Sequence, residues 1–250
     1  MEQKIALITG ATSGIGKATA IEFAKHGINL ILCGRRQEQL NKLKKELETK
    51  VQVYTLAFDV RSKDAVFEAM NSLPENFIQI DILINNAGNA HGLDPIQDGN
   101  LDDWDAMMDG NVKGLLYVSK AIMPQMIARQ SGHIINIGSS AGKEVYPKGN
   151  VYCASKHAVL AITEGMRIDL NPYGIKVGAI NPGLVETEFS KVRFKGDAIA
   201  DTVYKGYKAL QAEDIAEIIY FTVSRPAHVN IADILVFPTA QANSVTLKKR

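Results

Sequence analysis

The stretch Ile5-Ala6-Leu7-Ile8-Thr9-Gly10-Ala11-Thr12-Ser13-Gly14-Ile15-Gly16 joins an apolar run to a glycine-rich turn. A short continuous apolar run is typical of a strand buried on both faces. A helical pattern follows the turn to about His26, so the order is strand, glycine turn, helix. At such a junction glycines let the backbone approach a pyrophosphate, and the helix N-terminus offers free N–H groups. The stretch therefore predicts a nucleotide-binding turn.

The spacing of this turn is Gly-x-x-x-Gly-x-Gly, which differs from the general Gly-x-Gly-x-x-Gly dinucleotide motif. The alternative is an ordinary glycine-rich turn, but its place between the first strand and the first helix favours nucleotide binding. The residues of the turn that we expect to bind the cofactor are Gly10, Thr12, Ser13, Gly14, Ile15 and Gly16.

The rest of the chain continues this alternation of strand-length apolar runs and helical patterns. We expect further strands at 29–33, 51–58, 81–85, 133–137, 176–180 and 234–237. We expect helices around Leu40, Leu43 and Leu47, and at 62–73, 101–129, 150–171 and 212–223, with a possible interruption near Gly110. Strands that alternate with helices predict an α/β fold with a doubly wound parallel sheet. The 250 residues contain no repeat or linker, so we expect a single domain spanning 1–250.

Composition excludes several classes of protein. The formal net charge of +1 implies no strong attraction to nucleic acid or to a membrane surface. No apolar run approaches the length of a membrane span. The first strand begins too early for an N-terminal targeting segment, and Cys33 and Cys153 need not pair, so we expect a cytoplasmic protein. The five histidines have no metal-ligand spacing and are interpreted as surface or helix-end residues, so no metal site is expected.

Two arginines follow the second predicted strand, where an acidic ribose-binding residue would favour NAD. Arg35 and Arg36 can hold a 2′-phosphate bidentately and stack on adenine. This favours NADP(H) as the cofactor. The alternative is that one or both are ordinary surface arginines.

Tyr152 and Lys156 lie one helical turn apart within the helix predicted at 150–171, so both side chains project from one face. A nearby ammonium favours the phenolate and lowers the pKa of a tyrosine, which makes the pair a candidate general acid/base. Alone, such a pair is weak evidence. Ser139 lies 13 positions upstream (152 − 139 = 13) at the end of a predicted strand, where its hydroxyl can donate to a substrate oxygen. Ser140 is adjacent, so the choice between the two serines depends on spacing.

Two polar segments complete the candidate site. Asn85-Asn86-Ala87-Gly88 ends the predicted strand at 81–85, at the sheet edge where ligands bind in such folds. We expect this segment to lie near the cofactor, although a purely structural role is favoured for Asn85. Asn111 lies within the helical region 101–129 and could hold a water molecule that relays the proton.

These motifs together resemble the short-chain dehydrogenase/reductase family. They match it in order over nearly the whole chain, at Thr9–Gly16, Asn85–Gly88, Asn111, Ser139, Tyr152 with Lys156, and Pro182-Gly183. The resemblance implies a seven-stranded Rossmann fold and a homotetramer or homodimer. It also implies that Tyr152 exchanges the proton, that Lys156 lowers the pKa of Tyr152 and binds the nicotinamide ribose, and that Ser139 positions the carbonyl. Asn111 would support the proton relay.

The resemblance also implies where the cofactor lies. Asp59 and Val60 would contact the adenine, and Asn86 the adenosine ribose, with Ala87 and Gly88 alongside. The stretch 182–190 would lie along the nicotinamide half. Its residues expected at the cofactor are Pro182, Gly183, Val185 and Thr187.

The last third of the chain resembles one subgroup, the NADP-dependent 3-hydroxy acid dehydrogenases, which include serine and allo-threonine dehydrogenases. The stretches that carry this resemblance are 183–190, 192–194, Tyr146-Pro147 and Phe237-Pro238-Thr239. It implies oxidation of the 3-hydroxyl of a small acid, or reduction of a semialdehyde, with Tyr146 at the substrate. A small acid needs a cation, and Arg193 lies where a substrate-covering lid is expected, at 183–210. We therefore interpret Arg193 as the carboxylate anchor; a surface or interface arginine is the alternative.

Two other functions remain open at this stage. The same scaffold can reduce a ketone, a steroid or an acyl thioester, because fold alone does not select a substrate. A catalytically silent NADP sensor is the second alternative. The complete set of Ser139, Tyr152 and Lys156 disfavours a sensor, which has no need of a general acid/base.

Overall fold

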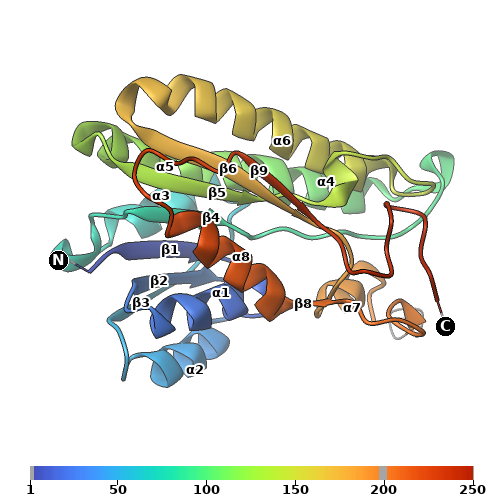
Figure 1. Cartoon of the computed structure of the whole chain (residues 1–250), viewed down its shortest axis with the longest axis horizontal. Helices are drawn as coiled ribbons and strands as arrows, with labels where there is room; N and C mark the ends of the chain where they lie inside the picture. The colour runs from blue at the N-terminus through green and yellow to red at the C-terminus, as the bar shows by residue number, and fades with distance from the viewer. Residues whose placement is uncertain (1–2, 197–201, 250) are drawn as a thin grey trace.

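A seven-stranded parallel sheet runs through the middle of the protein (Figure 1). The computed structural model describes residues 3–196 and 202–249, and residues 1–2, 197–201 and 250 lie outside that description. The strand order is β3-β2-β1-β4-β5-β6-β9, and every neighbouring pair is parallel. The strands are β1 (Ile5–Thr9), β2 (Asn29–Gly34), β3 (Val53–Ala57), β4 (Ile82–Asn85), β5 (Gly132–Ile137), β6 (Ile175–Pro182) and β9 (Asp233–Val236). The predicted Rossmann fold is therefore confirmed.

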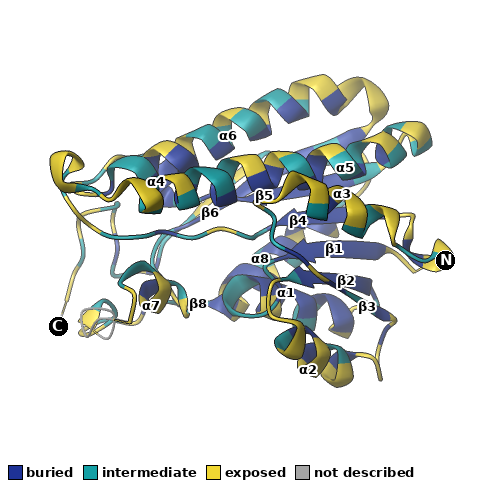
Figure 2. Ribbon diagram, turned by 180° about the vertical axis from the view of Figure 1, so that it is seen from behind, coloured by how far each residue is buried: buried dark blue, intermediate teal, exposed yellow. Residues whose placement is uncertain are grey.

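Helices cover both faces of this sheet (Figures 1 and 2). One face carries α1 (Gly14–Lys25), α2 (Gln37–Leu47) and α8 (Ala212–Val223). The other carries α3 (Lys63–Asn71), α5 (Gly114–Arg129) and α6 (Asn150–Leu170), and α4 (Leu101–Met108) packs against α6. Each strand supplies both layers: Ala6 and Ile8 of β1 pack into the first, Ile5 and Leu7 into the second. Because successive side chains point to opposite faces, a strand between two helical layers is apolar throughout.

The helical region predicted at 101–129 is interrupted where the sequence suggested. Between α4 and α5 lies a π-helical stretch, Asp109–Lys113, which contains Gly110 and Asn111. Three short elements were not predicted, because two to five residues carry too little periodicity. They are β7 (Val185–Glu186), α7 (Phe189–Arg193) and β8 (Leu210–Gln211), with β7 and β8 paired as a small parallel sheet.

His133 differs from its expected place at the surface. It lies in β5 with 4% of its surface exposed, and neither ring nitrogen has a hydrogen-bond partner among the described residues. Burial lowers the pKa of this imidazole to about 3, so the ring is neutral near pH 7. The surface interpretation of His133 was therefore wrong, because an isolated histidine in a sequence does not reveal which layer covers it.

The order in which the chain adds strands to the sheet reverses at β1. The chain winds outward from β1 through β2 to β3, and then crosses to β4 on the other side of β1. The carboxyl ends of β1 and β4, at Thr9 and Asn85, consequently lie side by side. In open α/β sheets ligands bind at this reversal point.

Candidate active site

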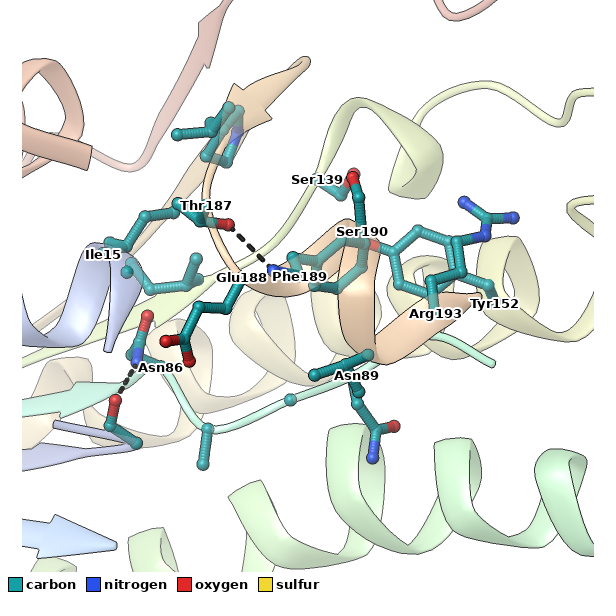
Figure 3. Close-up of a pocket in the computed structure, with 18 of the residues that line it drawn as sticks. Ile15, Asn86, Asn89, Ser139, Tyr152, Thr187, Glu188, Phe189, Ser190 and Arg193 are labelled. Carbon is teal, nitrogen blue, oxygen red and sulfur yellow. Dashed lines mark hydrogen bonds between the residues drawn. The ribbon is translucent and has the colours of Figure 1, made fainter. Parts of the chain in front are cut away.

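A cleft of about 620 Å³ opens along the carboxyl ends of the strands. Figure 3 shows Ile15 and Asn86 toward one side of it, and Ser139, Tyr152 and Arg193 toward the other. Every residue predicted from the sequence to bind cofactor or substrate, or to act in catalysis, lines this cleft except Gly16 and Asn111. The tertiary structure thus brings together residues that are spread from Gly10 to Arg193.

The glycine turn forms the floor between β1 and α1. Gly10 and Gly14 have φ of +65° and +52°, which glycine adopts without steric cost. Ser13 caps α1 without a side-chain hydrogen bond, and the first turn of this helix carries no acidic residue. The first N–H groups of α1 therefore stay open to an anion.

Gly16 does not line the cleft and has a packing role. A Cβ atom at this position would lie 2.4 Å from the carbonyl oxygen of Gly10 and 2.5 Å from Asn86 Nδ2. Asn86 Nδ2 donates to the Thr9 and Gly10 carbonyl oxygens at 2.9 and 3.2 Å. Thr9 Oγ1 accepts from the N–H groups of Asn86 and Ala87, both at 3.0 Å. Gly16 therefore lets α1 close onto this junction, which ties the turn to the end of β4.

The neighbouring Asn85 braces the sheet and does not reach the cleft. Its Nδ2 donates to Ser119 Oγ at 2.9 Å and to Asn136 Oδ1 at 2.8 Å. These bonds connect β4 with α5 and β5, in agreement with the structural role favoured from the sequence.

Arg35 and Arg36 lie at the rim of the cleft, and both are exposed. Arg36 donates to Thr12 Oγ1 at 2.9 Å and forms an ion pair with Glu188 at 3.4 Å. Asp59 lines the same end, where it pairs with Arg61 at 2.6 Å. Two cations beside the glycine turn are thus available to an anion bound there.

Asn111 does not line the cleft, although the sequence suggested a water-binding role for it. Its Oδ1 accepts from the Asn89 N–H at 2.8 Å, and its Nδ2 donates to the Asn89 carbonyl oxygen at 2.8 Å and to Ser155 Oγ at 3.0 Å. Both amide hydrogens are used, because one NH₂ group has two donors. The side chain instead fastens the π-helical stretch to α6 next to Lys156.

Ser139, Tyr152 and Lys156 meet above the end of β5. Ser139 Oγ accepts from the Ala141 N–H at 3.1 Å, which fixes the loop that follows β5. Tyr152 is 8% exposed, and its ring packs against Phe189 with centroids 5.8 Å apart. Lys156 Nζ donates to the Ile137 carbonyl oxygen at 2.9 Å. Ser140 also lines the cleft, so the preference for Ser139 still depends on its spacing from Tyr152.

The pKa of the tyrosine differs from the expectation. Burial raises the pKa of the Tyr152 phenol and Tyr146 adds to the rise, whereas Ser139 and Arg193 lower it. Burial also lowers the pKa of Lys156 to about 8. Removing a side chain from water disfavours its charged form, and here this outweighs the attraction expected from an ammonium one turn away. In the protein alone the phenol is therefore less acidic than the sequence predicted.

Arg193 reaches the cleft from α7. Its Nε donates to the Gly92 carbonyl oxygen at 3.1 Å, and its Nη1 donates to the Tyr146 hydroxyl at 3.0 Å. The guanidinium carbon lies 5.6 Å from the centre of the Tyr152 ring and 5.7 Å from that of Tyr146. A cation therefore stands beside the candidate acid/base.

The segment 183–210 forms one wall of the cleft, although 197–201 lies outside the described residues. Tyr204 holds it together: its hydroxyl accepts from Ser190 Oγ at 2.8 Å and donates to the Val185 carbonyl oxygen at 2.7 Å. Lys195 pairs with Asp103 of α4 at 3.0 Å.

Sequence reasoning missed several contacts in the cleft. Phe189 lies within the stretch 182–190 predicted along the nicotinamide half, but its packing on Tyr152 depends on the turn of α7. Gln241 and Ser244 lie near the C-terminus, beyond every motif, and still line the cleft. Proximity of this kind arises from tertiary folding, and no local spacing indicates it.

The described residues also bear on metal binding and on membrane insertion. Within 3–196 and 202–249, no three His, Cys, Asp or Glu side chains group closely enough to hold a metal ion. Over the same residues, every helix is too short or too polar to cross a membrane.

Comparisons with known proteins give the context of this site. Residues 4–198 match the protein family described as short chain dehydrogenase. The chain is 47% identical over 240 residues to sulfoacetaldehyde reductase 2 of Chromohalobacter salexigens, which covers 95% of each chain. It is 45% identical over 240 residues to the NADP-dependent 3-hydroxy acid dehydrogenase YdfG of Salmonella typhi, covering 95% of this chain and 96% of that protein. The closed form of a serine dehydrogenase complexed with NADP+ superposes with a TM-score of 0.93 at 43% identity, covering 98% of this chain and 99% of that one.

Proposed function

The chain belongs to the short-chain dehydrogenase family, and from this premise we propose an NADP(H)-dependent oxidoreductase that acts on small 3-hydroxy acids. It would oxidise the 3-hydroxyl of acids such as serine, allo-threonine, 3-hydroxyisobutyrate or 3-hydroxypropionate, or reduce the corresponding semialdehydes. The resemblance read from the motifs is confirmed, including that to the 3-hydroxy acid subgroup.

The observation that carries the proposal is the position of Arg193. Its guanidinium lies beside the Tyr152 ring, and the Gly92 carbonyl and the Tyr146 hydroxyl hold it there. A planar guanidinium binds an acid group through paired N–H donors. An acid bound by Arg193 would thus have its neighbouring carbons near the Tyr152 hydroxyl, which suits a 3-hydroxy acid.

The opposite end of the cleft fits a dinucleotide with a 2′-phosphate. Open N–H groups of α1 suit a pyrophosphate, and Arg35 and Arg36 at the rim suit a second anion. A Cβ atom on Gly14 would lie 3.3 Å from Thr187, so a side chain at Gly14 would narrow the part of the cleft between these two residues. Relatives named as NADP-dependent support the same cofactor. The bound cofactor would supply hydride exchange at the nicotinamide C4.

The protein's own task is to bind, orient and manage one proton. Ser139 would donate a hydrogen bond to the reacting oxygen, and Tyr152 would exchange the proton with it. Lys156 would supply positive charge below the site and a donor for the nicotinamide ribose. Asn111 is a positioning residue, because it holds Ser155 and thereby the turn of α6 that carries Lys156.

The segment 183–210 is proposed as the cover of the substrate. It places Arg193 and Phe189 over Tyr152, and it is connected to α4 through Lys195 and Asp103. A homotetramer, or a homodimer, remains the expected assembly, and sedimentation of the purified protein would measure it.

A second candidate is reduction of an aldehyde that carries a sulfonate. The relative named sulfoacetaldehyde reductase 2 supports it, because a guanidinium binds a sulfonate by the same paired donors. Ketone, steroid and acyl-thioester reduction are less favoured, since none of them requires a cation next to the acid/base.

The test is turnover of a substrate panel by wild type and by Arg193→Met. The panel contains serine, allo-threonine, 3-hydroxyisobutyrate, 3-hydroxypropionate, sulfoacetaldehyde and a hydrophobic ketone, each with NADP(H) and NAD(H). Losing a charge-assisted bond costs roughly 1.5–3 kcal/mol, so KM for the acids should rise about 10- to 100-fold while the ketone changes little. Lys191→Met is the matched control, because it removes an exposed cation from the same helix, α7. Equal effects of Arg193→Met on acids and ketone would remove Arg193 from this role.

A further inference from the structure

The C-terminal segment returns to the cleft after the last strand. Residues 241–247 form a small hairpin, in which Gln241 bridges Leu247 and the Ala242 N–H donates to the Thr246 carbonyl oxygen at 3.0 Å. In Figure 1 this segment descends from β9 at the end of the molecule that holds α7. Two of its residues, Gln241 and Ser244, line the cleft.

Hydrogen bonds place this hairpin at the substrate end. Gln241 Oε1 accepts from the Leu184 N–H at 2.9 Å, at the start of the proposed cover. The Ser244 N–H donates to Glu144 Oε2 at 2.8 Å, in the loop that follows Ser139. The hairpin thus spans from the base of the cover to the loop of the candidate catalytic serine.

The first of these bonds determines which way the Gln241 amide faces. A backbone N–H can only donate, so the oxygen of the side chain must face Leu184 and the NH₂ group must point elsewhere. Gln241 is 6% exposed, and its Nε2 has no hydrogen-bond partner in 3–196 or 202–249. This nitrogen is also not among the unpartnered atoms sealed inside the protein, of which Ser244 Oγ is one. Gln241 lines the cleft, so its unpartnered NH₂ group is available to a molecule bound there.

We infer that Gln241 is a specificity-determining residue, whose NH₂ group donates to the acid group of the substrate held by Arg193. An NH₂ group bonds acceptor oxygens only, which carboxylates and sulfonates offer and alkyl groups do not. The Arg193 guanidinium would attract the acid group electrostatically, and the Gln241 NH₂ group would fix its orientation through a directional hydrogen bond. This inference rests on the proposed function, since it concerns the same substrate.

The sharpest test is Gln241→Glu. Glutamate has the same shape and keeps an oxygen for the Leu184 N–H, but it presents a second oxygen to the cleft in place of the donor. KM for the acid substrates should rise by a factor of about 10 to 100, while KM for a neutral ketone and Kd for NADPH stay within about threefold. A purely structural defect would raise KM for the acids and for the ketone alike.

Two further variants keep the result interpretable. Val245→Ala alters the same hairpin at an exposed side chain that does not line the cleft, so it should leave KM for the acids unchanged. Gln241→Met removes the donor without adding charge, and should raise KM for the acids alone if Gln241→Glu fails to fold.

Unchanged KM for the acids in both Gln241 variants would overturn the inference while leaving the proposed function intact. A comparable loss of NADPH affinity would also overturn it, by assigning Gln241 to the cofactor. Wild-type protein that turns over no acid in the panel would instead remove the proposed function, and this inference with it.

Discussion

The two ends of the cleft are held in place by different parts of the molecule. At the cofactor end, β1 and β4 pair in register and Asn86 ties the glycine turn to the strand ends through backbone atoms. At the substrate end, the short helix α7 and the loops beside it supply the wall, and Arg193 is held by a carbonyl oxygen 101 positions away and a hydroxyl 47 positions away. The cofactor end is thus part of the sheet framework, and the substrate end is assembled from short segments outside the sheet.

This difference predicts how each end responds to mutation. Backbone groups in a framework cannot move without disturbing the strands beside them, so added atoms there should reduce stability and cofactor binding. Substitution of side chains that face the cleft from α7 and the loops beside it should change which substrates are accepted, while the fold persists.

Tyr152→Phe should separate chemistry from architecture at the substrate end. The phenyl ring keeps its packing on Phe189, so the fold and the affinity for NADPH should stay within threefold of wild type. Turnover should fall about 1,000-fold, because a positioned acid/base contributes of that order. Steady-state rates and an NADPH fluorescence titration measure the two quantities. Undiminished turnover in a folded variant would refute the mechanism.

Gly16→Ala should show the rigidity of the cofactor end. The new methyl group would lie 2.4 Å from the Gly10 carbonyl oxygen, a backbone atom that cannot turn aside. The free energy of unfolding should fall by about 3 kcal/mol, with weaker NADPH binding. Gly165→Ala is the control: this glycine lies in α6 with nothing within 4 Å, so alanine there should raise stability by about 0.5–1 kcal/mol. Urea unfolding compares them, and equal stability of the two variants would contradict the framework description.

His133→Leu should change stability without affecting either end, since His133 lies in the sheet core at the start of β5. Burial depresses the pKa of His133 from 6.5 to about 3, so the folded state resists a proton that the unfolded chain accepts. The free energy of unfolding linked to the neutral His133 ring is present in full above pH 6.5. It falls as the pH is lowered toward 3, with a loss of about 2 kcal/mol at pH 5.

The leucine variant should therefore lose about 2 kcal/mol less than wild type between pH 7 and pH 5, as followed by urea unfolding. His228→Leu replaces an exposed histidine and should show the wild-type pH dependence. The same acid sensitivity in all three proteins would mean that His133 is not the group responsible.

Glu188→Gln tests an ion pair that connects the two ends. Glu188 belongs to the proposed cover, and its partner Arg36 lies at the cofactor rim 3.4 Å away. The pair is half exposed and should contribute less than about 1 kcal/mol, so releasing Arg36 should tighten NADPH binding only two- to threefold. Binding of NADH, which lacks the 2′-phosphate, should stay unchanged. A similar gain for both cofactors would show that Arg36 does not distinguish them.

Much of this site was predictable because its motifs depend on local geometry. The glycine turn follows a strand and begins a helix, and Tyr152 and Lys156 share one helix face; both features depend on a few consecutive residues. Asn111 and Gly16 were assigned to the cleft for the same reason, by position within a motif. The Asn111 side chain and the Gly16 backbone lie behind its wall, where each packs against backbone atoms that no motif describes.

The chain's apolar pattern determined the order of strands and helices, because a strand buried on both faces is apolar throughout, whereas a helix needs apolar residues at spacings of three to four. It also determined the glycine turn and the family, through short spacings along the backbone. Tertiary structure decided how acidic Tyr152 is, what holds Arg193 and which way the Gln241 amide faces. These properties depend on desolvation and on contacts between distant segments, which exist only after the whole chain has packed.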